Sequence, residues 1–402
     1  MFKPTPQQTE AVFSVLLGLI FASLFIGQAL THVSAVLFLL WLIITRPLLP
    51  WIPAFWWLAG FAAWEWTSNY IGPYHGEGIE NGGISYHFLL ILFPLCLSVI
   101  NYSKLLTYIT IGATASALLI WAQALIGLDL DASPLRIDWE DGMLFDRATG
   151  FNGRPWETQF IHSMILLSIL PHLEWNRLKT WLAFPALLSG VLLPQIRAVI
   201  AAFIAALGIQ LIFTEQPGST KILLRRLSTV IVITILCIGT IAALRPDFFN
   251  KLATGNGRDR IFPASYEIFK QYPLTGIGGG EHFKEHYQQS WIDLGWHEEG
   301  YQHLEDSIGH AHSDGLMLLA HHGWPALLLW TGFIIHCLIF VWRHGKHSER
   351  ILFISLVTMH HIAGLSETYL DYSNTTYTLI LCYGLALHKP ARRYLKSSLE
   401  KN

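Results

Sequence analysis

The sequence predicts an all-α polytopic membrane protein with about 12 transmembrane helices. Hydrophobic residues make up 52% of the 402 residues, charged residues make up only 13%, and tryptophan occurs 16 times. A soluble globule of this size needs more charged surface, so a lipid bilayer must supply part of the surroundings. Apolar windows of about 17 to 25 residues, which is long enough to cross a hydrocarbon core, recur along the chain.

These apolar windows define the expected spans. We place them at residues 11–30, 33–49, 51–68, 86–101, 104–127, 159–175, 179–194, 196–214, 228–245, 316–342, 351–369 and 374–388. No internal repeat is visible in the sequence. We therefore expect one integral membrane domain over residues 1–402 rather than two repeated halves.

The positive charges set the expected orientation. When the spans alternate from a cytoplasmic N-terminus, the cationic connections fall on the cytoplasmic side, as the positive-inside rule requires. These cations are Arg46, Lys104, Arg177, Lys179, Lys221, Arg225, Arg226, Arg343, Lys346, Arg350, Lys389, Arg392, Arg393 and Lys396. Both chain termini are then cytoplasmic. The acidic and Gly-rich connections, including residues 68–85 and 128–158, face the opposite side.

The longest outward connection, residues 247–313, is expected to carry part of the active site. It contains GNGRDRIFPASYEIFKQYPLTGIGGG and ends in HAHS, so arginines, glycines and histidines collect at one membrane surface. Its pattern predicts an amphipathic helix lying against the membrane, with an apolar stripe formed by Ile261, Tyr266, Phe269 and Tyr272. The glycines that follow lack the lysine of a phosphate-binding loop, so we interpret them as a flexible hinge.

Arg197 opens the predicted span 196–214, directly after the tight turn LLPQ. It should therefore lie at the outer rim of the membrane, beside the free backbone N–H groups of a helix N-terminus. A guanidinium in that place suits a phosphate, because it forms bidentate hydrogen bonds. The alternative is a snorkelling arginine that only marks the membrane interface.

Arg258 and Arg260 lie in GNGRDRIF, just before the expected surface helix. Two guanidinium groups on a turn flanked by glycines can converge on a second phosphate. Asp259 stands between them, and an ordinary surface ion pair is the alternative interpretation.

Histidines crowd the same connection, at positions 282, 286, 297, 303, 310 and 312. HFKEH and HAH have spacings that metal ligands use, but no complete ligand set is recognisable, so surface or packing roles are expected and no metal is predicted. His312 differs, because it stands where the polar connection becomes a membrane helix. There it shares a water layer with Arg197 and Arg258, and an imidazole in that position suits a general base.

Two classes of partner are not expected. The four cysteines lie within apolar stretches, so the sequence predicts neither a disulfide framework nor a thiolate metal site. The net charge is -2 and no basic arm or patch is present, so nucleic acid is not an expected partner. Membrane lipids are the expected surroundings.

Three blocks of sequence carry a family resemblance. They are QIRAVIAAF, the arginine turn with its amphipathic segment and PLTGIGGG, and HAHSDGLMLLAHHGWPALLLW. Together they resemble the shared core of the O-antigen ligase and polymerase superfamily, which also includes the bacterial O-linked protein oligosaccharyltransferases. The resemblance covers residues Leu193 to Trp330 at the level of motifs, and the layout of spans with one large outward connection matches across the chain.

The last block departs from the family at one position. The family pattern reads His-Ala-His-Asn with Leu three residues on, whereas this chain has Ser313 in place of the asparagine and keeps Leu316. The resemblance implies that Ser313 lies at the substrate, but that it does not make the contact that an asparagine makes there. RATGFNGRPWETQFIHSM is similar to a junction of loop and span in these proteins, which implies that Arg147 and Arg154 line the same cavity.

The resemblance implies a glycosyltransferase that needs neither metal nor cofactor, in the bacterial inner membrane with its active site facing the periplasm. Its donor is a glycan linked to undecaprenyl pyrophosphate. Arg197 and Arg258 are expected to hold the diphosphate and to neutralise charge on the leaving group, with Arg260 as a substitute for Arg258. His312 is expected to take the proton of the acceptor hydroxyl, and His310 is the second candidate for that role.

Several functions remain open at this point. A ligase passes the glycan to a lipid A-core sugar, a polymerase passes it to another carrier-linked repeat, and an oligosaccharyltransferase passes it to Ser or Thr of a protein. The third type resembles the chain less, because its members tend to have longer outward C-terminal parts. From another class, a lipid-carrier flippase or transporter explains the spans but not the outward arginines and histidines.

Overall fold

The structure is a computed structural model. It describes residues 5–26, 28–45, 51–74, 102–126, 128–129, 136–137, 155–174, 177–194, 196–213, 258–278, 282–296, 310–370 and 373–400, with single positions between 93 and 97 and between 228 and 235. The predicted spans 86–101 and 228–245 therefore lie largely outside the described residues, as do Arg147 and Arg154.

The described residues form a helical protein, as predicted, with 12 α-helices. They are α1 (Pro6–Ser23), α2 (Gln28–Thr45), α3 (Pro53–Ile71), α5 (Tyr102–Ile126), α6 (Pro155–Ile169), α7 (Leu178–Leu192), α8 (Arg197–Phe213), α11 (Arg258–Gln271), α12 (His282–Asp293), α14 (Asp314–His344), α15 (His347–Gly364) and α16 (Ser373–Leu399). A 3-10 helix follows α6 (Leu170–His172), and the two-residue strands β1 (Leu128–Asp129) and β2 (Arg136–Ile137) pair antiparallel.

Local sequence signals explain where several helices begin. Thr5 and Gln8 form a capping box at the start of α1, in which each side chain bonds the backbone N–H of the other residue. Pro53 stands in the first turn of α3, where its missing N–H costs no hydrogen bond. At the start of α15 the Glu349 carboxylate accepts the backbone N–H of Lys346 at 2.7 Å.

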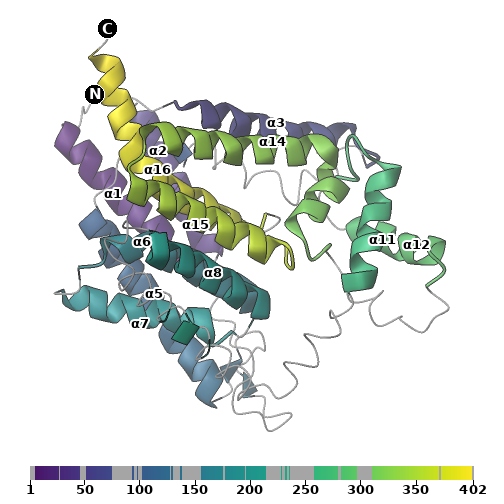
Figure 1. Cartoon of the computed structure of the whole chain (residues 1–402), viewed down its shortest axis with the longest axis horizontal. Helices are drawn as coiled ribbons and strands as arrows, with labels where there is room; N and C mark the ends of the chain where they lie inside the picture. The colour runs from purple at the N-terminus through teal and green to yellow at the C-terminus, as the bar shows by residue number, and fades with distance from the viewer. Residues whose placement is uncertain are drawn as a thin grey trace.

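The long helices pack side by side around one large apolar core (Figure 1). α14 packs along α3, α15 packs along α8, and α5 packs against α1 and α7. Both chain termini lie at one end of this bundle, whereas α11 and α12 lie at the opposite end (Figure 1). The arrangement thus separates the termini from the segment that carries the predicted arginines and histidines.

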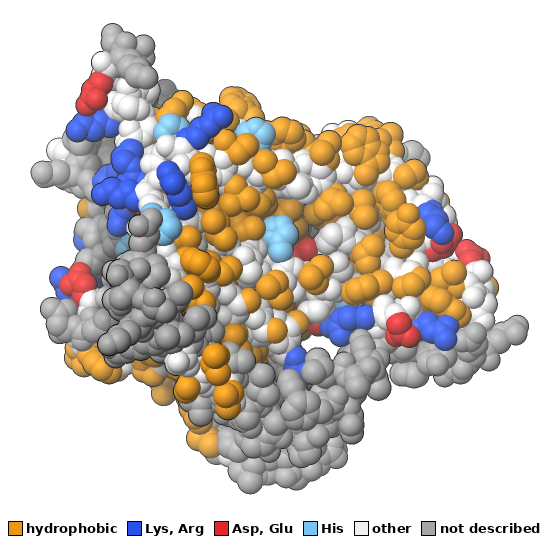
Figure 2. Space-filling view, viewed as in Figure 1, with side chains coloured by type: hydrophobic (Ala, Val, Ile, Leu, Met, Phe, Trp, Pro, Cys, Tyr) orange, Lys and Arg blue, Asp and Glu red, His pale blue; other side chains and the backbone are white. Residues whose placement is uncertain are grey.

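Two of these helices are long and apolar enough to cross a membrane by length and composition, at Lys104–Leu125 in α5 and Asp314–His344 in α14. Shorter apolar helices occupy Ala11–Ser23, Val33–Thr45, Leu178–Leu192 and Arg197–Phe213. Apolar side chains spread over the middle of the face shown in Figure 2. On α14 the exposed apolar side chains include Leu328, Ile335, Ile339 and Trp342. Such a wide apolar surface is typical of helices in contact with lipid.

α15 ends earlier than predicted. The span expected at 351–369 continues only to Gly364, and residues 365–370 form a turn that we name the Glu367 turn. The last residue of α15 is a glycine, a common residue at helix ends, and the turn that follows is held by hydrogen bonds from Tyr369 and Leu370 to Asp314. This correction places Glu367 outside a helix.

The hinge interpretation of the first glycines in GIGGG is wrong. Gly276 and Gly278 have φ of 63° and 85°, and a Cβ on Gly276 would overlap the backbone of His321. The N–H groups of Ile277 and Gly278 donate to α14 carbonyls at 2.9 and 2.8 Å. Those carbonyls are available because α14 breaks at Gly323, whose φ is 71°. This stretch is a fixed contact with α14.

The helix predicted in RIFPASYEIFKQY is present as α11, but it begins earlier, so that Arg258 and Arg260 lie in its first turn and not on a turn before it. Its buried stripe also differs from the expected one. Ile261, Ala264, Ser265 and Ile268 are buried, whereas Tyr266 is 45% exposed. Ile261 and Ile268 belong to a second apolar cluster with α12 and the first turns of α14. The apolar face of α11 therefore packs against protein, not against the membrane surface as the sequence suggested.

Candidate active site

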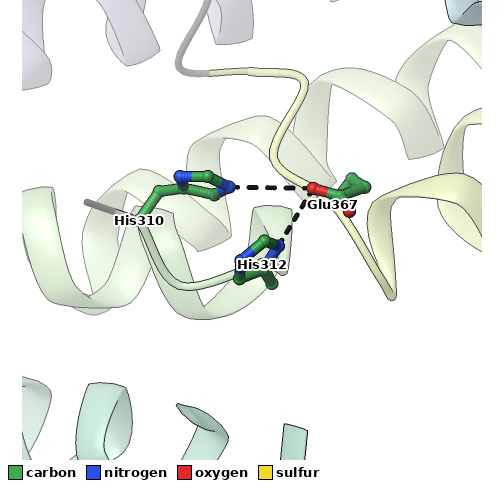
Figure 3. A group of neighbouring side chains, drawn as sticks. All are labelled: His310, His312 and Glu367. Carbon is green, nitrogen blue, oxygen red and sulfur yellow. Dashed lines mark hydrogen bonds and ion pairs between the residues drawn. The ribbon is translucent and has the colours of Figure 1, made fainter. Parts of the chain in front are cut away.

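Two histidines and one glutamate meet where the chain enters α14 (Figure 3). His312 Nδ1 lies 3.0 Å from Glu367 Oε2, and His310 Nε2 lies 3.7 Å from the same oxygen. The two imidazole rings stand 4.2 Å apart between centroids. The segment just before α14 and the Glu367 turn thus contribute facing halves of one cluster.

The backbone at His312 is unusual. Its φ of 49° lies in the left-handed region, and among the described residues no other non-glycine has a positive φ. A non-glycine residue in this region is uncommon, and such strain collects at functional sites, where the surroundings hold it in place. The conformation turns the HAH segment so that both imidazoles face the Glu367 carboxylate.

Glu367 is ionised at neutral pH. Burial favours its neutral acid, but the neighbouring His310 and His312 outweigh that effect and lower the pKa of the carboxyl to about 2. An ionised carboxylate only accepts hydrogen bonds, so His312 Nδ1 must donate to it. In the neutral form of such a ring the lone pair is on Nε2, the nitrogen that faces away from Glu367. This is the arrangement of a general base oriented by a carboxylate.

Arg258 joins the same cluster from the start of α11. Its Nη2 donates to the carbonyl of Ser366 at 2.8 Å and lies 3.5 Å from Glu367 Oε1. The arginine therefore contacts the Glu367 turn through both its backbone and its carboxylate. The structure brings three of the predicted residues, Arg258, His310 and His312, around one glutamate that the sequence analysis did not single out.

Arg197 lies at the same end of the bundle. α8 and α15 run antiparallel, since His347 Nε2 lies 2.6 Å from the carbonyl of Phe213 and Gln210 Nε2 lies 2.8 Å from Ser355 Oγ. The last residue of α8 thus meets the first residue of α15. Arg197, the first residue of α8, is consequently at the level where α15 ends and the Glu367 turn begins. The prediction that α8 starts at this arginine is confirmed.

The remaining predicted residues take different places. The Arg260 guanidinium stacks on the Trp296 ring at 4.7 Å from the centroid, whereas Arg258 reaches the Glu367 turn. Ser313 precedes the first turn of α14, but its side chain makes no capping hydrogen bond there. Arg147 and Arg154 lie outside the described residues.

Glu367 was missed because no recognisable motif pairs it with the histidines. The predicted span 351–369 also placed Glu367 inside a helix. A usable signal was present: an acid beside a serine at the outward end of a span, on the side expected for His312. Only the tertiary contact between the two loops shows which acid meets the histidines.

The cluster has atoms that can bind a metal ion. The ligand atoms of His310, His312 and Glu367 all lie within 4.8 Å of one another, and two imidazoles with one carboxylate form a known ligand set. However, the Arg258 guanidinium lies 3.5 Å from the other oxygen of the same carboxylate. A fixed positive charge so close opposes a divalent cation and favours an anionic ligand.

The other histidine motif serves packing. On α12 the ring of His282 stacks on Tyr74 with centroids 3.6 Å apart, and the Tyr74 hydroxyl lies 2.7 Å from His286 Nε2. The packing role expected for these two histidines is therefore confirmed. His297 and His303 lie outside the described residues.

The comparison with protein families agrees with this geometry. A family model described as O-antigen ligase matches residues 163–331. The matched region contains Arg197, Arg258, His310 and His312, but it ends before Glu367. No curated protein matches the chain. The resemblance inferred from the sequence motifs is confirmed. The chain carries an O-antigen ligase domain and is an enzyme of the glycosyltransferase type.

Proposed function

We propose that this protein transfers a glycan from undecaprenyl pyrophosphate to a lipid A-core sugar at the periplasmic face of the bacterial inner membrane. The observation that carries the proposal is the His312–Glu367 pair with Arg258 beside it. It combines an oriented base with a nearby cation that can contact an anionic leaving group. A transfer that releases a diphosphate needs both.

The reaction runs as one displacement. The acceptor hydroxyl gives its proton to His312 Nε2 while its oxygen attacks the anomeric carbon of the donor glycan. The bond between that carbon and the diphosphate oxygen breaks, and undecaprenyl pyrophosphate leaves with the electron pair. The Glu367 carboxylate stabilises the imidazolium that forms, as the acid of a catalytic triad does.

The arginines serve the leaving group. Arg258 and Arg197 stand at the same end of the bundle, and their guanidinium groups neutralise the charge that develops on the diphosphate. Arg260, His310 and Ser313 are assigned to substrate binding beside them. Arg147 and Arg154 are assigned to the wall of the same cavity on the strength of the family resemblance. An arginine keeps its charge at any physiological pH, so this site needs no metal to hold the diphosphate.

The proposed orientation rests on charge. Lys and Arg gather at the end of the bundle that holds the termini (Figure 2). Exposed cations in the last turn of α14, between α14 and α15 and on α16 are Arg343, Lys346, Lys389, Arg392 and Lys396. The positive-inside rule makes this end cytoplasmic. The cluster around Glu367 then faces the periplasm, where lipid-linked glycans are joined. We propose about 12 spans, with residues 247–313 as the large periplasmic connection.

The acceptor is the least constrained part of the proposal. A polymerase that joins carrier-linked repeats needs the same base and cations, and so does a protein oligosaccharyltransferase. Deleting the gene and separating the lipopolysaccharide on a gel distinguishes them. Loss of every capped form with accumulation of carrier-linked polymer supports the ligase. A cap of one repeat indicates a polymerase, and unchanged lipopolysaccharide with an altered glycoprotein indicates the third type.

Activity should survive the removal of divalent metal ions. The expected transfer rate of purified enzyme after dialysis against a chelator is close to the untreated rate, because arginines hold the leaving group. The control is the same treatment followed by one divalent ion at a time. Loss of activity that a single ion restores would contradict the proposal and would make His310, His312 and Glu367 metal ligands.

A further inference from the structure

Asp314 ties the Glu367 turn to the start of α14. Its side chain is buried, with 7% of the residue exposed. Its Oδ1 accepts the backbone N–H groups of Tyr369 at 2.6 Å and Leu370 at 2.9 Å. Both donors belong to the Glu367 turn, and hydrogen bonds to an ionised carboxylate are about twice as strong as neutral ones. One oxygen of Asp314 thus holds the second half of this turn.

The other oxygen is also engaged. Asp314 Oδ2 lies 3.1 Å from His360 Nε2, and His360 Nδ1 lies 3.0 Å from the hydroxyl of Tyr383. Gly364 packs against the same carboxylate so closely that a Cβ there would overlap Oδ2. Asp314 therefore connects α14, α15 and α16 through one buried network.

This network fixes both halves of the proposed catalytic pair. His312 lies two residues before Asp314 along the chain, and Glu367 lies two residues before Tyr369. The first half of the Glu367 turn is held separately, because the N–H of Glu367 donates to the carbonyl of Ala363 at 3.2 Å. Removing Asp314 would break the link between the turn and the segment that carries His312, while the Thr376 hydroxyl would still bond the carbonyls of Tyr369 and Leu370.

We propose that Asp314 is the positioning residue that sets the Glu367 carboxylate against His312. The inference rests on the proposed function, since it assigns Asp314 a role in that reaction. Asp314 acts through the backbone and does not touch the reacting atoms. Its two oxygens are occupied by Tyr369, Leu370 and His360, so it does not serve as an alternative general base.

Hydrogen exchange tests the anchoring without any assay of activity. In the full-length protein in detergent, Asp314→Ala should raise the exchange rate of the Tyr369 and Leu370 amides at least about tenfold, because two charge-assisted hydrogen bonds are lost. Asp314→Asn keeps one carbonyl oxygen for these amides, so its exchange should stay close to the parent rate. Unchanged exchange in Asp314→Ala would overturn the anchoring.

A double-mutant cycle then tests the link to Glu367. Asp314→Ala should lower the transfer rate up to about 100-fold with little change in donor KM, as expected for a misplaced catalytic pair. In a Glu367→Gln background the same change should cost little more, because the contact that Asp314 maintains is already lost. Asp314→Asn should recover most of the parent rate. The matched control is Gln210→Leu, a buried hydrogen-bonding residue of α8, whose effect should be the same in both backgrounds.

The outcomes separate the two proposals. The positioning role is wrong if the fold losses in transfer rate of Asp314→Ala and Glu367→Gln multiply in the double variant, as they do for independent changes. It is also wrong if Asp314→Asn is as impaired as Asp314→Ala. If Glu367→Gln itself transfers glycan at the parent rate, the proposed catalytic pair is wrong. The exchange data still report whether Asp314 anchors the turn in that case.

Discussion

His312→Gln should lower the rate of glycan transfer by at least about two orders of magnitude while donor binding persists. The His312 ring is directed by an ionised carboxylate, so its Nε2 is ready to take a proton. Glutamine has similar length and polarity but cannot accept a proton at this position. The arginines proposed to hold the diphosphate are unchanged in this variant. Single-turnover transfer and binding of a carrier-lipid donor, measured on the same preparation, separate the two effects.

Two neighbouring histidines serve as controls for this result. His310→Gln should cost much less, because His310 Nε2 lies 3.7 Å from Glu367 rather than 3.0 Å. His321→Gln should also cost much less, because His321 is buried in α14 and packs against Phe283. Near-parental turnover in His312→Gln, or loss of donor binding along with turnover, would show that His312 is not the base.

Arg258→Ala and Arg197→Ala should each abolish transfer without removing the protein from the membrane. Each replacement deletes a cation from the end of the bundle at which we propose that the diphosphate leaves. Arg258→Ala also removes a contact with the Glu367 turn. Lysine at either position should restore little activity, since a single ammonium group does not reproduce the bidentate fork of the guanidinium. Complementation of a deletion strain, with membrane levels of each variant measured in parallel, checks this prediction.

Arg260→Ala is the matched control for the arginine series. It removes a cation from the same helix, two residues from Arg258, but one that stacks on Trp296. It should retain far more activity than Arg258→Ala. Near-normal activity in both Arg258→Ala and Arg197→Ala would rule out the diphosphate assignment, and an Arg260→Ala variant as inactive as Arg258→Ala would divide the role between the two residues.

The sequence predicted the helical fold and the residues that open the helices at the site. Arg197, Arg258 and His312 each stand at or just before the start of a helix, because a polar residue next to an apolar run marks that boundary. These starts are local features, and the structure has α8 begin at Arg197 and α11 begin at Arg258. The family match over residues 163–331 includes the same segments.

What the sequence did not predict depends on contacts between distant segments. The turn after α15 is bonded to Asp314, which lies 50 residues before Gly364 in the chain. The buried stripe of α11 contains Ala264 and Ser265, small residues whose burial follows from the close approach of α14. Glu367 was overlooked for the same reason, since its partners lie in another loop. Periodicity along one segment cannot reveal such contacts.

The most direct test of the central claim is the release of undecaprenyl pyrophosphate by the purified protein in a lipid bilayer. The donor is a carrier-linked glycan, the acceptor is lipid A-core, and the buffer contains a chelator. We expect one molecule of undecaprenyl pyrophosphate released for each glycan joined to the acceptor, with both products formed far more slowly by His312→Gln and by Glu367→Gln. Glycan transfer by Glu367→Gln at the parent rate, or transfer that proceeds without release of the carrier diphosphate, would contradict it.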